Sequence, residues 1–92
     1  MNSVRELFVE TVELIDQKGT ARRYDYFILI GEMDVGAYAC ESYGIRVSEQ
    51  GGPQAQAENV TCSAARIDAL SDLMIRNGVT PATFDEVLSD WL

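Results

Sequence analysis

The segment YDYFILI, residues Tyr24–Ile30, decides the fold. It is rich in aromatic and β-branched side chains, and such a nearly continuous apolar run is typical of a central strand that is covered on both faces. The cluster Asp16–Gly19 before it has the composition of a turn. Leu7–Ile15, on the other side of that turn, is rich in Val, Thr and Phe. We therefore predict an N-terminal β-hairpin whose first strand begins near residue 4.

An amphipathic helix is the alternative for residues 4–15. The apolar side chains of this segment recur at helical spacing, at Val4, Leu7, Phe8, Val12 and Ile15. The periodicity by itself fits both structures, whereas the turn and the strand-like segment that follow favour the hairpin.

A third strand is predicted from about Tyr38 to Ser48. Gly31–Gly36, before it, carries two glycines and two acids and is expected to form a loop. Within the strand, Gly44 indicates a β-bulge or a close approach of another backbone.

A fourth strand, near Gln54–Thr61, completes the predicted meander. The segment Glu49–Pro53 separates it from the third strand, because paired glycines and a proline interrupt a strand ladder. This strand has the weakest signal, since its alanines and glutamines have little strand preference.

Two helices are predicted after the sheet. Ser63 is a suitable N-cap for the first helix, over about residues 64–77, and Asn77-Gly78 is a suitable stop. For the second helix, residues 84–92, Thr83 and Glu86 have the spacing of a capping box. Its apolar side chains form one stripe: Phe84, Val87, Leu88, Trp91 and Leu92. A helix this short is not stable in water by itself, so the stripe must dock on another element.

These elements predict one α+β domain over residues 1–92. Its antiparallel sheet of three or four strands, an N-terminal hairpin plus a meander over about residues 4–61, is covered on one face by the two C-terminal helices. A chain of 92 residues buries only about two-thirds of its unfolded surface, and a subunit interface is a common way to add buried area.

Charge and hydropathy bear on partners and location. Fifteen acidic and seven basic residues give a net charge of −8, which a phosphate backbone repels, so no nucleic acid partner is expected. The longest aliphatic or aromatic run, Tyr26–Ile30, is far shorter than the roughly 20 residues of a membrane helix, so no membrane partner is expected. The opening segment carries charges where a secretory signal has its apolar core, which predicts a cytoplasmic location.

Residues that carry chemistry are missing from the sequence. It contains no histidine, the commonest general base and metal ligand, and no glycine-rich phosphate loop or calcium-binding loop. Cys40 and Cys62 lack the spacing of a metal site, and we expect both to be reduced, buried thiols. We therefore predict no catalytic, cofactor-binding or metal-binding residues and no cofactor.

The last two residues, Trp91 and Leu92, are the candidate interface. The simpler interpretation is that Trp91 belongs to the core, because the stripe of so short a helix needs to be buried. The functional interpretation is that Trp91 and Leu92 close a contact with a second copy or with another protein, where aromatic anchors are enriched.

The closing segment NGVTPATFDEVLSDWL, Asn77–Leu92, resembles that of a family of short Firmicutes proteins, domain-of-unknown-function family six-five-one-four. In that family a β-rich first half, often with a Tyr-Gly-Ile like Tyr43–Ile45, leads to a helix, a Val-Thr-Pro turn and a helix that ends in an acid, an aromatic residue and Leu. The likeness covers roughly half of the chain, and Asp34–Cys40 has no counterpart in it. The resemblance implies the predicted fold and carries no activity, substrate or site residues.

The leading functional hypothesis is a small, non-catalytic intracellular module that associates with itself, as a homodimer, or with another protein. The alternative is a small-molecule-binding or carboxylate-based enzymatic domain with a pocket between sheet and helices. The absence of histidine and of cofactor motifs favours the first.

Overall fold

The computed structural model describes residues 5–36 and 38–92. In them the chain forms a sheet and then two helices, which confirms the predicted α+β fold class. The elements are β1 (Arg5–Ile15), β2 (Ala21–Val35), β3 (Tyr38–Glu49), β4 (Gln54–Thr61), α1 (Ala64–Arg76) and α2 (Phe84–Trp91).

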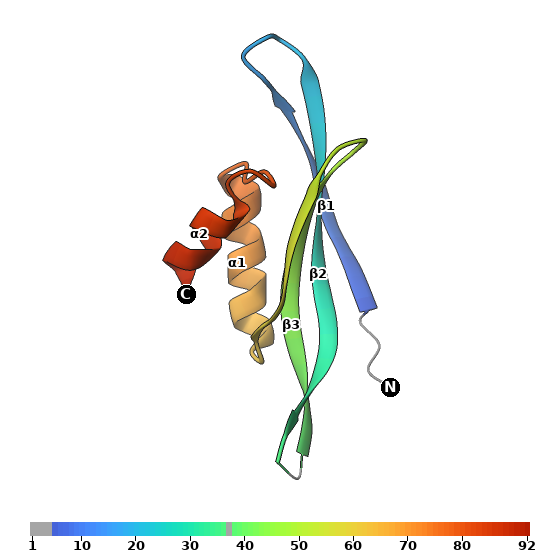
Figure 1. Ribbon diagram of the computed structural model, residues 1–92, viewed down its shortest axis with the longest axis vertical. Coiled ribbons are helices and arrows are strands. Elements are labelled where there is room, and N and C mark those ends of the chain that lie inside the picture. Colours follow the sequence, from blue (N-terminus) through green and yellow to red (C-terminus); the bar gives the residue numbers. More distant parts are fainter. Residues whose placement is uncertain (1–4, 37) are drawn as a thin grey trace.

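The sheet is an antiparallel meander with strand order β1-β2-β3-β4, and both helices lie on the same side of it (Figure 1). Helix α1 packs over β2, β3 and β4, and α2 packs beside β4, so the helical layer is displaced from β1. The molecule is elongated, 53 × 26 × 17 Å, because the β1–β2 and β2–β3 hairpins extend past the helices at opposite ends (Figure 1).

The core lies between the sheet and the helices. Alternate residues of a strand face the same side, and the part of β2 and β3 that packs against the helices is apolar on that side, over Tyr24–Ile30 and Tyr43–Val47. Each fully buried large side chain there contributes roughly 1.5–3 kcal/mol relative to exposure. The core residues are Tyr24, Tyr26, Ile28, Ile45, Val47, Ile67, Leu70, Met74, Val79, Phe84 and Leu88.

One buried hydrogen bond joins the two layers. The hydroxyl of Tyr26, a fully buried residue of β2, donates to the backbone carbonyl of Val79 at 2.7 Å, in the connection between α1 and α2. Burial, with smaller effects of Tyr24 and Glu10, raises the pKa of Tyr26 to about 12. The bond thus holds the turn between the helices against the centre of the sheet.

Gly44 in β3 is required by its neighbour β4. The pairing shifts between Tyr43, opposite Thr61, and Ile45, opposite Ala57, so β4 bulges beside Gly44. A Cβ atom on Gly44 would overlap the carbonyl oxygen of Ala57. The prediction of a bulge or a close backbone approach is confirmed.

The predicted hairpin is confirmed, because β1 pairs with β2 from Arg5 opposite Ile30 to Ile15 opposite Ala21. The alternative of an N-terminal helix is therefore wrong. The predicted loop at Gly31–Gly36 is also wrong, since β2 continues to Val35 and stays paired with β3. Backbone pairing with β3 extends the strand through residues whose composition is typical of a loop.

The helix bounds agree with the prediction, but one of the predicted caps differs. Ser63 Oγ accepts a hydrogen bond from the Arg66 amide at 3.2 Å, and Gly78 after α1 has φ of 60°, as expected for a C-terminal stop. The capping box at Thr83 is wrong, because Thr83 Oγ1 instead accepts from the Thr80 amide at 3.1 Å. A local turn competes for the hydroxyl that the box would use.

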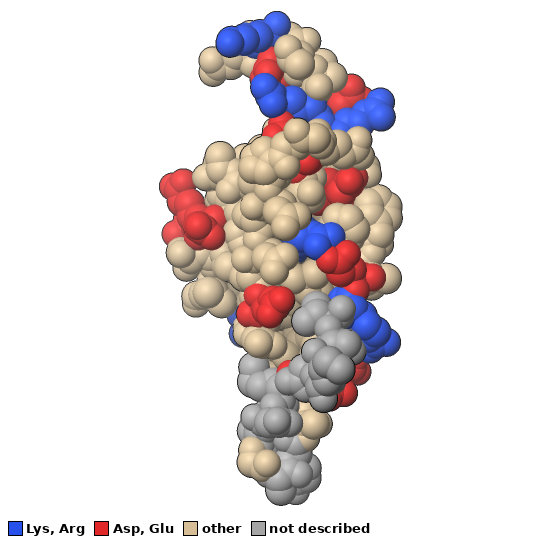
Figure 2. All heavy atoms as spheres, turned by 45° about the vertical axis from the view of Figure 1, so that its right-hand side comes forward, with Lys and Arg blue, Asp and Glu red and all other residues tan. Residues whose placement is uncertain are grey.

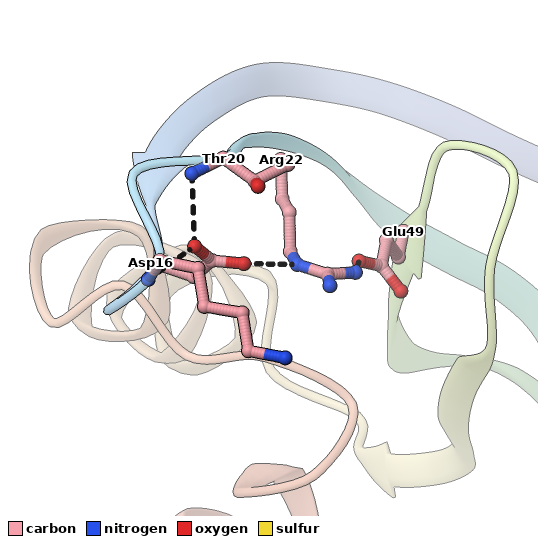
Figure 3. A network of polar contacts seen from close by, with 5 residues as sticks. Asp16, Thr20, Arg22 and Glu49 are labelled. Carbon is pink, nitrogen blue, oxygen red and sulfur yellow. Dashed lines mark hydrogen bonds and ion pairs between the residues drawn. The ribbon is translucent and has the colours of Figure 1, made fainter.

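The β1–β2 turn is closed by one carboxylate (Figure 3). Asp16 Oδ1 accepts from the amides of Lys18 and Thr20 at 2.9 Å each, and Oδ2 pairs with Arg22 Nε at 3.1 Å. Arg22 also pairs with Glu49 of β3 at 2.8 Å. The Thr20 amide, followed by the Arg22 side chain, lowers the pKa of Asp16.

Neither helix of the described part of the chain has the length and apolar composition needed to cross a bilayer.

Replacing Tyr26 by Phe removes the hydroxyl that satisfies the Val79 carbonyl. We expect the free energy of unfolding at pH 7 to fall by about 1–3 kcal/mol, because a buried acceptor is left unpaired. Tyr43→Phe, on the same face of β3, is the matched control and should change stability by less than about 0.5 kcal/mol. Urea unfolding measures both. In wild type, stability should also fall as pH rises from about 10 toward 12, because the unfolded state loses the tyrosine proton first. The loss should be smaller in Y26F, where Tyr24 is the remaining buried tyrosine with a raised pKa.

Asp16→Asn keeps a side-chain acceptor in the turn but removes the ion pair to Arg22. A carboxyl whose pKa is lower in the folded than in the unfolded state stabilises the fold above the unfolded pKa, and this stability is lost as pH falls through the folded pKa. We therefore expect a lower melting temperature for D16N than for wild type at pH 7, and a difference that shrinks below about pH 4. Asp90→Asn, an exposed change on α2, serves as control; a D16N deficit that persists at acid pH would contradict the electrostatic account.

Candidate functional site: the outer edge of β1

Strand β1 forms one edge of the sheet. Its inner side pairs with β2, and no described strand pairs with its outer side. An open edge presents unpaired amides and carbonyls and is a template for another strand. The edge is long, since β1 runs from Arg5 to Ile15.

Three consecutive large apolar residues of β1 are exposed. Leu7 is 53%, Phe8 54% and Val9 38% exposed. The pairing shifts between Phe8 and Glu10, which places Val9 in a β-bulge. This cluster, Leu7–Val9, lies on an edge that the helices leave uncovered.

The residues of β1 on the two faces of the sheet differ in what they contact. Arg5, Leu7, Glu10 and Val12 lie opposite residues of β2 that face the helices, whereas Phe8 lies opposite Phe27 on the open face of the sheet. The Phe8 and Phe27 rings meet edge to face, with centroids 5.6 Å apart. Phe8 therefore supports the sheet itself, and Leu7 and Val9 are the residues free for an external contact.

An acidic groove separates β1 from α1. Its volume is about 270 Å³. Val9, Ile28 and Ile75 supply apolar lining; Glu10, Asp68, Ser71 and Asp72 supply the polar lining. Asp72 pairs with Arg76 at 3.1 Å, but both side chains are well exposed, so this pair is weak. The groove favours a cationic group from outside.

A second, smaller pocket lies on the open face of the sheet. Its volume is about 200 Å³, and it is lined by Leu29, Gly31, Glu32, Ser42, Gly44, Glu58 and Asn59. Ser42 is 1% exposed, and its Oγ has no hydrogen-bond partner among the described residues. Asn59, in the bulged part of β4, has φ of 55°. The bulge and the two glycines create the hollow beside the Ser42 hydroxyl.

The predicted interface residues lie at the end of α2. Trp91 is half-buried against the core, and the guanidinium of Arg66 stacks over its ring at 4.6 Å from the centroid. Leu92 is 73% exposed. A contact through Trp91 and Leu92 stays a prediction.

The two cysteines, 22 positions apart, lie side by side. Their sulfur atoms are 3.5 Å apart. Cys62 is exposed and Cys40 is half-buried, so the prediction of buried thiols is wrong for Cys62. The hydrogen bond that the two thiols share, with a smaller effect of burial, raises the pKa of the Cys40 thiol.

Charge is unevenly distributed over the surface. Figure 2 shows Lys and Arg side chains gathered at the end of the molecule where β1 turns into β2, the segment that contains Lys18, Arg22 and Arg23.

Within residues 5–36 and 38–92, no group of three or more His, Cys, Asp or Glu side chains is arranged to hold a metal ion.

Residues 5–92 match the model of a family described as a family of unknown function, DUF6514. The chain belongs to this family. The resemblance seen in Asn77–Leu92 is thereby confirmed. The match covers nearly all of this chain, rather than the half expected from the sequence. Comparisons with curated proteins and with solved structures gave no match.

Sequence reasoning missed the surface that this DUF6514 protein exposes on β1. The signal was present, because Leu7-Phe8-Val9 is a run of three apolar residues in a strand whose other apolar residues occur singly or as a pair. Its exposure depends on the displacement of α1 toward β4, which no local pattern contains.

Proposed function

We propose that this chain is a protein-association module that pairs with a second copy of itself through the outer edge of β1. The observation that carries the proposal is the open edge strand with the exposed apolar cluster Leu7–Val9. Monomeric proteins usually protect such edges, and an added strand satisfies the edge amides and carbonyls.

If the β1 strands of two copies pair antiparallel, edge to edge, about a twofold axis near Phe8 and Val9, corresponding faces of the two strands lie on the same side of the joined sheet. Arg5 of one copy then lies opposite Val12 and diagonal to Glu10 of the second copy, within reach of a long side chain. Arg5 approaches the acidic groove in this arrangement. This charge complementarity favours a second copy as the occupant.

The contact that Arg5 makes within its own chain does not oppose this arrangement. Arg5 pairs with Glu41 at 3.3 Å, and the two side chains are 71% and 55% exposed. Such a pair contributes little, about 0–1 kcal/mol, and is readily exchanged. Glu6, Glu10 and Glu13 along the same strand discourage unlimited strand addition, so that a closed dimer is favoured over a fibre.

Leu7→Lys combined with Val9→Lys places two charges in the proposed interface. We expect the wild type to dimerise at micromolar to millimolar concentrations, and the double variant to dissociate with an affinity reduced by roughly a hundredfold or more. Sedimentation equilibrium measures the change, and circular dichroism checks the fold. Ile15→Lys, at a 73% exposed position on the same strand, is the matched control and should leave the dimer intact.

A charge swap tests the register. Arg5→Glu should weaken the dimer, and Glu10→Arg in the same chain should restore it, because the diagonal pair is re-formed with reversed signs. A wild type that stays monomeric at millimolar concentration, or a dimer that L7K/V9K leaves unchanged, would refute association through β1. A dimer lost on Trp91→Ala, with Leu7 and Val9 changes silent, would move the interface to Trp91 and Leu92.

The second candidate function is binding of a small amine in the open-face pocket. The specific observation that favours it is the buried, unpartnered Ser42 hydroxyl, because leaving such a group unsatisfied costs about 1–3 kcal/mol. Glu32 and Glu58 line the same pocket, and neither forms an ion pair with another described residue. A primary ammonium group would satisfy both the hydroxyl and the carboxylates.

Titration with 1,4-diaminobutane, followed by amide NMR shifts, tests the pocket. We expect shifts centred on Ser42, Gly44 and Asn59, and an affinity that falls about tenfold in Ser42→Ala and in Glu58→Gln, since each removes a hydrogen bond to a charged group. The diol of the same length, 1,4-butanediol, is the control ligand. Equal shifts with the diol, or none with the diamine, would exclude the amine site.

A further inference from the structure

The Cys40 and Cys62 thiols form a contact that the proposed association does not use. Cys40 lies in β3, and Cys62 directly follows the end of β4 and precedes Ser63, the N-cap of α1. Figure 1 shows this turn between β4 and α1 beside the lower part of β3. The contact therefore spans a junction between the sheet and the helical layer.

The two sulfur atoms are in direct non-bonded contact. They are 3.5 Å apart, and a disulfide requires about 2.05 Å, so they need to approach by about 1.5 Å. We propose that Cys40 and Cys62 are a redox modification site at which low-molecular-weight disulfides are exchanged for an intramolecular disulfide.

The two cysteines differ in exposure, so they have different roles in the exchange. Cys62 is exposed, so it meets a small disulfide from solution first. Cys40 is half-buried, and its pKa is raised by the hydrogen bond that its thiol shares with Cys62, so it is the weaker nucleophile while that bond is intact. Once Cys62 carries an adduct, Cys40 is the adjacent thiol that resolves it.

The exchange balances in two steps. The Cys62 thiolate attacks one sulfur of a disulfide RSSR, an S–S bond forms to Cys62, and RS⁻ leaves and takes up the proton that Cys62 lost. The Cys40 thiolate then attacks Sγ of Cys62, the mixed disulfide breaks, and a second RS⁻ leaves and is protonated. Two protein thiols are oxidised by two electrons, and one RSSR is reduced to two RSH.

The bond would close the chain around the irregular part of the sheet. The segment between the cysteines contains the rest of β3, all of β4 and the bulge beside Gly44. A crosslink over a loop of this length restricts the unfolded chain, so the oxidised form is more stable to heat. The fold thus carries a site whose stability responds to the ratio of disulfide to thiol in solution.

Incubation of the wild type with oxidised glutathione, followed by intact-mass spectrometry, tests the proposal. We expect a loss of two mass units with no glutathione retained, a melting temperature raised on the order of 10 °C, and reversal of both by dithiothreitol. Cys40→Ser should instead retain one glutathione on Cys62, because the resolving thiol is missing. Cys62→Ser should react slowly, because only the half-buried thiol remains.

Two results would overturn the proposal. A stable glutathione adduct on wild-type Cys62 would show that Cys40 does not resolve it, and a crosslinked dimer on a non-reducing gel would show that the thiols pair between chains. The L7K/V9K variant should form the same intramolecular bond, which keeps this test separate from the association through β1.

Discussion

The bond from the Tyr26 hydroxyl to the Val79 carbonyl joins elements that are distant in the sequence and fixes how the helical layer sits on the sheet. It lies among fully buried side chains, where the low dielectric strengthens a satisfied hydrogen bond and makes an unsatisfied one costly. Because the turn between α1 and α2 is fastened to the middle of β2, α2 can pack its short apolar stripe beside α1 and β4. The helical layer covers Val12 and Leu14 of β1, which pack against the core, and leaves Leu7–Val9 of the same strand exposed.

The strands and helices were largely predictable because their signals are local. The composition of Tyr24–Ile30 and the turn before it identified the hairpin, and Gly44 identified a close approach that the bulge in β4 explains. The errors arose where a partner overrode composition. Gly31–Val35 became strand because β3 pairs with it, and Thr83 failed as a capping box because its hydroxyl bonds to Thr80.

The candidate sites were much less predictable than the fold. The apolar run Leu7–Val9 is visible in the sequence, but its exposure depends on where α1 lies. The open-face pocket and the thiol pair each bring together residues that are distant in the sequence, so their formation depends on how the strands pair. Trp91 and Leu92 drew attention because they end an apolar stripe, and the structure places the Trp91 ring under Arg66. Local sequence patterns predict secondary structure, but they do not predict surfaces that only the tertiary arrangement creates.

The β1–β2 hairpin reaches beyond the helices, and its tip around Lys18 is held by Asp16 and Arg22 rather than by the core (Figure 3). A segment with this support can change in length or composition with little cost to the rest of the fold, because few core contacts depend on it. The tip is therefore a suitable place to graft a foreign epitope or a fluorescent label, which would be displayed at one end of a 53 Å molecule.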